Sequence, residues 1–110
     1  MALQDRFQIV AAADADEAIA RAAATQPHAA VVDVAMPKGG GLRAVRGISE
    51  VSPRTAVVVL SADEQDALVR DLLAAGAMTY CRKGIWPQEL AVVIERSIRA
   101  HDIAASDADR

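Results

Sequence analysis

The sequence lacks the features that mark secreted and membrane proteins. It has one cysteine among 110 residues, Cys81, which excludes an internal disulfide and is typical of a reducing compartment. No apolar run approaches the ~20 residues that a membrane-spanning helix needs. The first six residues have neither the basic nor the apolar region of a secretory signal. We therefore expect a cytoplasmic protein that does not bind a membrane.

The sequence also lacks an excess of positive charge and the spacing of a metal site. It has 12 Lys and Arg against 15 Asp and Glu, a net charge of −3, so it offers no basic face to a nucleic acid. His28 and His101 have no second histidine, cysteine or carboxylate at ligand spacing, and we expect no transition-metal site. The glycines at 39–41 are not followed by the Gly-Lys-Ser/Thr of a phosphate-binding loop.

What is present is the composition of one globular α/β domain. Hydrophobic residues make up 53% of the chain and charged residues 25%. Because the connections between strands are too long for hairpins, we expect a parallel sheet with right-handed crossovers. The domain is expected to span residues 7–101, followed by a flexible tail at 102–110. The pattern predicts strands at residues 7–12, 29–34, 55–60 and 78–81, which alternate with helices at 15–24, at 42–51, before Gly76 and from Pro87.

Local signals place several helix ends. Asp14 precedes an acidic residue by three positions, the spacing of a capping box, so it is the predicted N-cap of the first helix. That helix is expected to turn residues 18, 19, 22 and 23 inward. Ser61 or Asp63 is the predicted cap of the third helix, each with an acidic residue three positions later. Pro87 suits the first position of the last helix.

Polar residues stand at the ends of three predicted strands. Asp33 lies at the end of the strand at 29–34, Ser61 follows the next strand, and Lys83 lies just past the last one. In open parallel sheets, ligands bind outside the carboxyl ends of the strands, so we expect these side chains to converge at one rim. Each also has a structural interpretation: Asp33 as a loop cap, Ser61 as a helix cap, and Lys83 as a solvated neighbour of Arg82.

Five short motifs occur in the order and spacing of a known family. They are Asp33-Val34-Ala35-Met36-Pro37, the glycine-rich loop before Leu42, Leu60-Ser61-Ala62, Ala74-Ala75-Gly76-Ala77 and Tyr80-Cys81-Arg82-Lys83-Gly84. Together they make residues 7–101 resemble the receiver domain of two-component response regulators. The resemblance implies a flavodoxin-like (CheY-like) fold, in which helices cover both faces of a parallel sheet.

The resemblance also implies a role for each site residue. Asp33 is the candidate phosphoacceptor and Lys83 the cation that contacts the phosphate. Ser61 is the switch hydroxyl and Tyr80 the switch aromatic, although a tyrosine in a strand is more often simply half-buried. Asp33 and the backbone carbonyl of Ala35 would bind magnesium. The implied partner is a sensor histidine kinase or another phosphodonor, and no enzymatic activity is expected beyond self-phosphorylation.

One part of the family pattern is missing from the sequence. The family begins with a strand that ends in paired acidic residues and with a helix, whereas residues 7–10 align with its second strand. We therefore expect an N-terminally truncated receiver with about four strands and four helices. Magnesium prefers several oxygen ligands, and Asp14 and Asp16 align with the following helix rather than with the acidic pair. The expected magnesium site is weak, and phosphorylation should be slow or absent.

The missing strand has a structural consequence. In the family's 2-1-3-4-5 sheet it lies in the centre, so the strands on either side lose their shared partner, which costs free energy. We expect repair by a homodimer, by strand exchange or by direct pairing of the strands at 7–12 and 29–34. The predicted dimer surface places Leu68, Val69 and Leu72 opposite Leu90 and Val93.

Two other functions fit the same sequence. A phosphorylation-independent interaction or dimerisation module of the same fold would bind by shape, and Asp33→Asn would leave its partners unchanged. A small α/β enzyme that binds a nucleotide or a flavin has slight support from the glycines at 39–41. A co-purifying chromophore or thermal stabilisation by nucleotides would identify the latter.

Overall fold

Four parallel strands form the centre of the protein in a computed structural model, which describes residues 7–12, 14–35, 40–62 and 66–108. The strand order is β1-β2-β3-β4, and every neighbouring pair is parallel. The predicted parallel sheet is therefore confirmed. The strands are β1 (Ile9–Ala11), β2 (Ala29–Asp33), β3 (Ala56–Ser61) and β4 (Thr79–Arg82).

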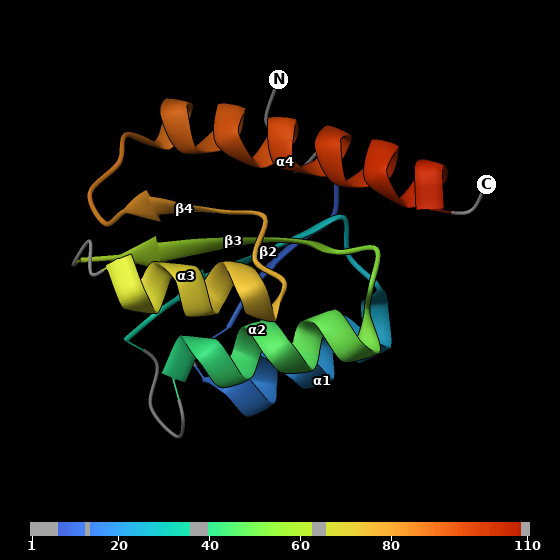
Figure 1. Ribbon diagram of the computed structural model, residues 1–110, viewed down its shortest axis with the longest axis horizontal. Helices are drawn as coiled ribbons and strands as arrows, with labels where there is room; N and C mark the ends of the chain where they lie inside the picture. Colours follow the sequence, from blue (N-terminus) through green and yellow to red (C-terminus); the bar gives the residue numbers. More distant parts are fainter. Residues whose placement is uncertain (1–6, 13, 36–39, 63–65, 109–110) are drawn as a thin grey trace.

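The helices lie in two layers, one on each face of the sheet. Figure 1 shows α4 alone on one face and the other three helices on the opposite face. This arrangement confirms the predicted helices on both faces, because each crossover between parallel strands must run over the sheet. The helices are α1 (Ala15–Thr25), α2 (Gly40–Val51), α3 (Asp66–Ala75) and α4 (Pro87–Ala108).

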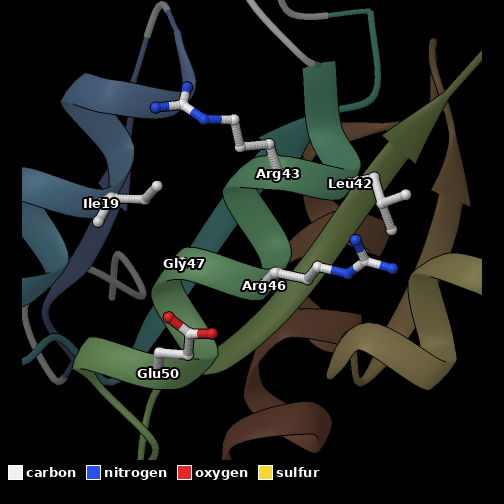
Figure 2. Close-up of a pocket in the computed structure, with 6 residues that line it drawn as sticks. All are labelled: Ile19, Leu42, Arg43, Arg46, Gly47 and Glu50. Atoms are coloured by element: carbon white, nitrogen blue, oxygen red, sulfur yellow. The ribbon is translucent and has the colours of Figure 1, made fainter.

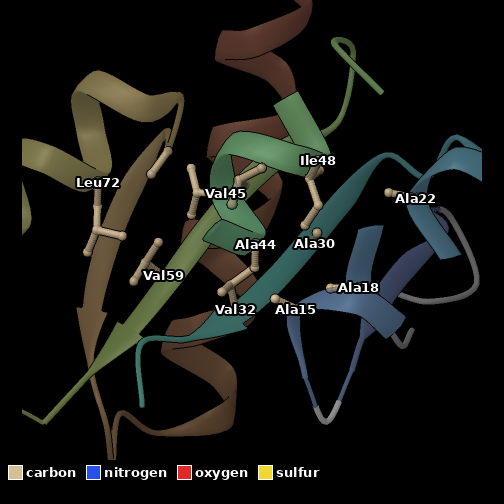
Figure 3. Close-up of a cluster of buried hydrophobic side chains, with 12 residues drawn as sticks. Ala15, Ala18, Ala22, Ala30, Val32, Ala44, Val45, Ile48, Val59 and Leu72 are labelled. Carbon is tan, nitrogen blue, oxygen red and sulfur yellow. The ribbon is translucent and has the colours of Figure 1, made fainter. Parts of the chain in front are cut away.

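Each face of the sheet has its own apolar core. Consecutive residues of β3 point to opposite faces, so Val57 and Val59 pack under α1, α2 and α3 whereas Val58 packs under α4. The larger core, shown in Figure 3, joins Ile48 of α2 and Leu72 of α3 to many alanines. Because helices cover both faces of the sheet, the sequence of β3 is an uninterrupted apolar run and does not alternate between apolar and polar residues.

The starts of α1 and α4 follow the local signals. The Asp14 carboxylate accepts a hydrogen bond of 2.8 Å from the Glu17 backbone N–H, which confirms it as the N-cap of α1. Pro87 occupies the first position of α4, as predicted. The predicted inward face of α1 is wrong at Ala23, which is exposed, while Ala15 is fully buried. The buried stripe therefore begins one turn earlier than the apolar pattern indicated.

The last helix is longer than the sequence predicted. It continues to Ala108 and includes most of the segment from residue 102 that was expected to be a flexible tail. Alanines at 104 and 105 favour the helix and explain the extension. The cap proposed at Asp63 lies outside the described residues. No described helix is both long and apolar enough to cross a membrane.

The first two strands pair directly with each other. Ile9, Val10 and Ala11 are in register with Ala29, Ala30 and Val31. Of the three predicted ways to satisfy these strands, direct pairing is the one observed within this chain. The backbone groups of β2 are thereby satisfied on both sides, by β1 and β3.

Of the residues predicted to form a dimer surface, Leu72 is buried, and Leu68, Leu90 and Val93 are partly buried against the two cores. Leu72 is 1% exposed, and Leu68 packs beside it under the α1–α3 layer. Leu90 and Val93 pack against the other core, under α4. The prediction is therefore wrong for Leu72, whereas the dimer surface itself stays a prediction.

Gly41 sets how closely α2 approaches the loop that follows Asp33. A Cβ atom at this position would lie 2.8 Å from the Val34 Cα and 3.4 Å from the Asp33 carbonyl oxygen. The Gly41 N–H donates a hydrogen bond of 3.2 Å to the Val34 carbonyl. A side chain here would push the helix from the backbone that carries the site.

Replacing Gly41 by alanine should therefore destabilise the protein by about 1–3 kcal/mol, the usual range for overpacking. Urea unfolding followed by circular dichroism measures the change. Val92→Ala, at a half-exposed position of α4 (48%), is the matched small change and should stay within about 0.5 kcal/mol of the parent. Equal stability of Gly41→Ala and the parent protein would contradict the close approach.

Candidate functional site

The carboxyl ends of β2, β3 and β4 lie at one edge of the sheet, as parallel pairing requires. Asp33, the last residue of β2, is in register with Leu60 of β3, and Ser61 is in register with Arg82 of β4. The loops beyond the strands stay joined: the Val34 N–H donates to the Leu60 carbonyl at 3.0 Å. Figure 1 shows the arrowheads of β3 and β4 at this edge.

Asp33 and Lys83 form an ion pair at this edge. The Lys83 Nζ lies 2.8 Å from the Asp33 Oδ2. The Lys83 backbone N–H donates to the Ser61 carbonyl at 2.9 Å, which holds the base of the lysine beside β3. The side chains of Lys83 and Asp33 are 39% and 43% exposed, so the pair remains open to a reactant from solvent.

The second oxygen of Asp33 binds its own loop. Its Oδ1 accepts a hydrogen bond of 2.9 Å from the backbone N–H of Ala35, two residues further on. This is the geometry of an Asx turn, which the sequence of an aspartate at a strand end could have indicated. Our sequence analysis considered only the Ala35 carbonyl and missed its N–H. Both oxygens of Asp33 therefore have a donor.

These contacts favour the ionised carboxylate. Partial burial raises the pKa of Asp33. The hydrogen bond from Lys83, the hydrogen bond from Ala35 and the charge of Lys83 lower it, and together they outweigh the effect of burial. The resulting pKa lies below the ordinary value of 3.8. Asp33 is thus a carboxylate at neutral pH, as a nucleophile must be.

The other two predicted site residues lie on β3 and β4. Ser61 is 5% exposed and follows Leu60, the register partner of Asp33. Tyr80 is 37% exposed and is in register with Val59, which places it on the face that α3 covers. The structure thus brings Asp33 and Lys83 into contact and places Ser61 at the same edge. Tyr80 lies further back along the sheet, in register with Val59, two residues before Ser61.

The donor set of this edge does not by itself make a metal site. In residues 7–12, 14–35, 40–62 and 66–108, no group of three or more His, Cys, Asp or Glu is placed to hold a metal ion. Asp14 is committed to capping α1. Asp16 is paired with Arg43 of α2, a contact that our sequence analysis missed because it joins two helices 27 residues apart. The described residues therefore do not fit a complete magnesium site.

Comparison with known proteins identifies the family. The family model of the response regulator receiver domain matches residues 1–95. The chain is 33% identical over 92 residues to an uncharacterized transcriptional regulatory protein, YxjL, of Bacillus subtilis strain 168, covering 84% of this chain and 42% of that protein. It is 34% identical over 91 residues to the response regulator GacA of Pseudomonas protegens, covering 82% and 43%. The chain thus spans less than half the length of these relatives.

Solved structures agree with the sequence comparison. A two-component response regulator of the LuxR family from Aurantimonas sp. SI85-9A1 superposes with a TM-score of 0.73 at 30% identity, over 81% of this chain and 64% of that one. The response regulator domain of CheB from Thermotoga maritima superposes with a TM-score of 0.64 at 26% identity, over 80% and 70%. The chain belongs to the family of response regulator receiver domains.

Proposed function

We propose that this receiver domain takes part in two-component signalling and that Asp33 is its phosphoacceptor. The contact that carries the proposal is the one between Asp33 and Lys83, at 2.8 Å, at the carboxyl edge of the sheet. A carboxylate that is ionised, partly exposed and beside a fixed cation is suited to attack phosphorus. Neither side chain is buried in a core, since they are 39% and 43% exposed. An exposed ion pair stabilises a fold little, so a purely structural role does not account for the pair as well as a role in phosphoryl transfer does.

The reaction is a simple displacement at phosphorus. An oxygen of Asp33 forms a bond to phosphorus, the bond between phosphorus and the donor's nitrogen or oxygen breaks, and the donor atom leaves with the electron pair. Lys83 then transfers its hydrogen bond from the carboxylate to a phosphoryl oxygen and offsets part of the added charge. Ser61 is the proposed hydroxyl partner of the phosphoryl group, and Tyr80 the aromatic that responds to it.

Magnesium binding by this chain is proposed to be weak. Asp33 and the Ala35 carbonyl can supply two oxygen ligands, but magnesium usually takes near-octahedral oxygen coordination. The described residues do not add a cluster of carboxylates. Without strong charge neutralisation, phosphoryl transfer to Asp33 is expected to be slow, since positioning and electrostatics supply most of the rate in this chemistry.

The proposed partner is a sensor histidine kinase or a small phosphodonor. One relative is a DNA-binding transcriptional activator, DevR/DosR of Mycobacterium tuberculosis. It is 34% identical to this chain over 79 residues, and the match covers 36% of that protein. We propose that this chain contributes signal reception and does not itself bind DNA, because its net charge is −3. It is proposed to have no enzymatic activity beyond its own phosphorylation.

The competing function is a phosphorylation-independent interaction module of the same fold. It would keep the Asp33–Lys83 ion pair only as a link between the loops after β2 and β4. The two functions differ in whether Asp33 gains a phosphoryl group and whether this changes partner binding.

Incubation with acetyl phosphate and magnesium should modify Asp33 slowly. We expect a rate at least about 100-fold below that of a receiver domain with its acidic pair, because metal neutralisation of the phosphoryl charge contributes several kcal/mol. Intact-mass spectrometry over time measures the modified fraction. Asp33→Asn should show none, and Lys83→Met should show less than the parent.

Two results would contradict parts of this proposal. Rapid and stoichiometric modification of Asp33 would show that magnesium is bound well. Modification that persists in Asp33→Asn, or none in the parent after saturating exposure to a cognate kinase, would remove Asp33 as acceptor and favour the interaction module.

The ionisation of Asp33 should depend on Lys83. In Lys83→Met the two contributions of the lysine are lost while the effect of burial stays, so the pKa of Asp33 should rise relative to the parent. Carboxyl ¹³C titration by NMR measures both values. Arg99→Met, which removes an exposed ion pair on α4, is the control and should leave Asp33 unchanged.

The same pair predicts how stability depends on pH. The folded-state pKa of Asp33 is depressed, so its contribution is fully present above the ordinary pKa of 3.8 and is lost as pH falls through the lower folded value. Because the pair is exposed, that contribution should be about 1 kcal/mol or less. Asp33→Asn should therefore be slightly less stable than the parent at pH 7 and equal to it well below the folded pKa. A constant difference across this range would contradict the assignment.

A further inference from the structure

The first strand lies at the edge of the sheet and is attached to it by few contacts. β1 has three residues, is outermost in the strand order and pairs with β2 alone. Short elements with few contacts open locally at a lower free energy than the core does. The bonds at the two ends of β1 therefore matter for its attachment.

The carboxyl end of β1 is fixed by α1. The Arg21 guanidinium donates a hydrogen bond of 3.0 Å to the carbonyl of Ala11, the last residue of β1. The helix that carries Arg21 is itself packed on α2: Figure 2 shows Ile19 beside Gly47, where a Cβ atom would collide with the Ile19 side chain. Because arginine stays protonated over the ordinary pH range, this attachment does not change with pH.

The amino end of β1 is fixed by a histidine that accepts a hydrogen bond. Gln8, just before β1, donates its backbone N–H to the Nδ1 of His28 at 2.9 Å. The Gln8 carbonyl accepts from the backbone N–H groups of His28 at 2.8 Å and of Ala29 at 3.3 Å. The rings of Phe7 and His28 meet at 68° with centroids 5.5 Å apart, which orients the imidazole. His28 thus joins the start of β1 to the start of β2.

The contact with Gln8 requires the neutral form of His28. A backbone N–H can only donate, so Nδ1 must accept, and the proton of the neutral ring lies on Nε2. A second proton would occupy Nδ1 and leave two N–H groups facing each other. Histidine is the side chain whose charge ordinarily changes between pH 5 and 8. This bond is therefore lost when His28 is protonated.

The charges near this end of the sheet leave the His28 ring alone. Residues 7–12 carry no charge, and Asp33 lies at the opposite end of β2. The charged and titratable groups at the last turns of the helices and before β3 are Glu50, Arg54, Arg99, His101 and Asp102. In the part of the chain that the structure describes, none of them forms an ion pair or hydrogen bond with the His28 ring.

We propose that protonation of His28 releases β1 from the edge of the sheet, so that the pairing of β1 with β2 depends on pH. The neutral ring binds the Gln8 N–H, whereas the protonated ring turns to solvent, which it can do because His28 is exposed. β2 then presents an unpaired edge over the residues that β1 had covered.

The second histidine of the chain makes a bond that protonation does not break. The His101 Nε2 lies 2.7 Å from the carbonyl oxygen of Pro53, which can only accept. The ring therefore donates, and it can do so in its neutral and in its protonated form. Acidification leaves this contact between α4 and the loop before β3 in place, so the effect is specific to His28.

This response to pH is separate from the proposed phosphorylation. His28 precedes β2 and Asp33 ends it. Asp33 is already a carboxylate across the range in which histidine titrates. Asp33→Asn should therefore respond to pH like the parent, and a failure of phosphorylation is distinguishable from a failure of this proposal.

Amide hydrogen exchange followed by NMR tests the proposal. Protection factors, which correct for the intrinsic effect of pH on exchange, are compared at about pH 8 and about pH 5. Those of the sheet-bonded amides in residues 9–11 should fall at least about fivefold at the lower pH, because losing one hydrogen bond changes a local opening equilibrium by about this factor. Those of β3 should change less than about twofold, since β3 is paired on both sides.

Two substitutions of His28 separate the acceptor from the charge. His28→Asn places an uncharged Oδ1 where Nδ1 lies, so the protection of residues 9–11 should no longer depend on pH. His28→Leu has no acceptor, so their protection should be low at both pH values. His101→Gln is the matched control and should keep the response of the parent, because its amide can still donate to Pro53.

Three results would overturn the proposal. They are equal protection of residues 9–11 at the two pH values in the parent, a His28→Asn variant that responds to pH as the parent does, and a His28→Leu variant as protected as the parent at the higher pH. If His28→Leu loses its circular dichroism spectrum, the parent and His28→Asn still decide the outcome.

Discussion

The parallel pairing of β2 with β3 is the interaction on which the rest of the structure depends. Five residues of each strand are in register, from Ala29 with Ala56 to Asp33 with Leu60. Both faces of this pair are covered, so its side chains supply the centre of both cores. Because parallel strands end at the same edge, the pairing also decides that Asp33 comes to lie beside the end of β3. Lys83 reaches the same edge through the pairing of β4 with β3.

The direct contact between β1 and β2 shows how the first two described strands are paired. The sequence resemblance left two strands without their shared partner, and association was one way to satisfy them. Within the described residues these strands satisfy each other. The pairing of β1 with β2 thus needs no second copy.

The predictions succeeded where a signal is local and failed where it depends on packing. Asp14 and Pro87 were placed correctly because a cap and a first helical proline act within one turn. The inward face of α1 was misplaced at Ala23, since alanine is compatible with either a buried or an exposed position. The end of α4 was placed too early because a polar, alanine-rich segment reads equally as helix or tail. The Asp16–Arg43 contact had no signal, as it joins separate helices.

The sequence by itself determined the alternation of strands and helices, the parallel sheet and the family, because apolar periodicity, caps and motif spacing are properties of short segments. It also indicated which three strand ends carry polar side chains. Only the tertiary structure decided that β1 pairs with β2, that Asp33 Oδ2 lies 2.8 Å from the Lys83 Nζ, and that Leu72 is buried in a core. The physical reason is that strand neighbours and ion pairs between loops depend on contacts between distant segments, and several arrangements satisfy the same local pattern until the whole chain packs.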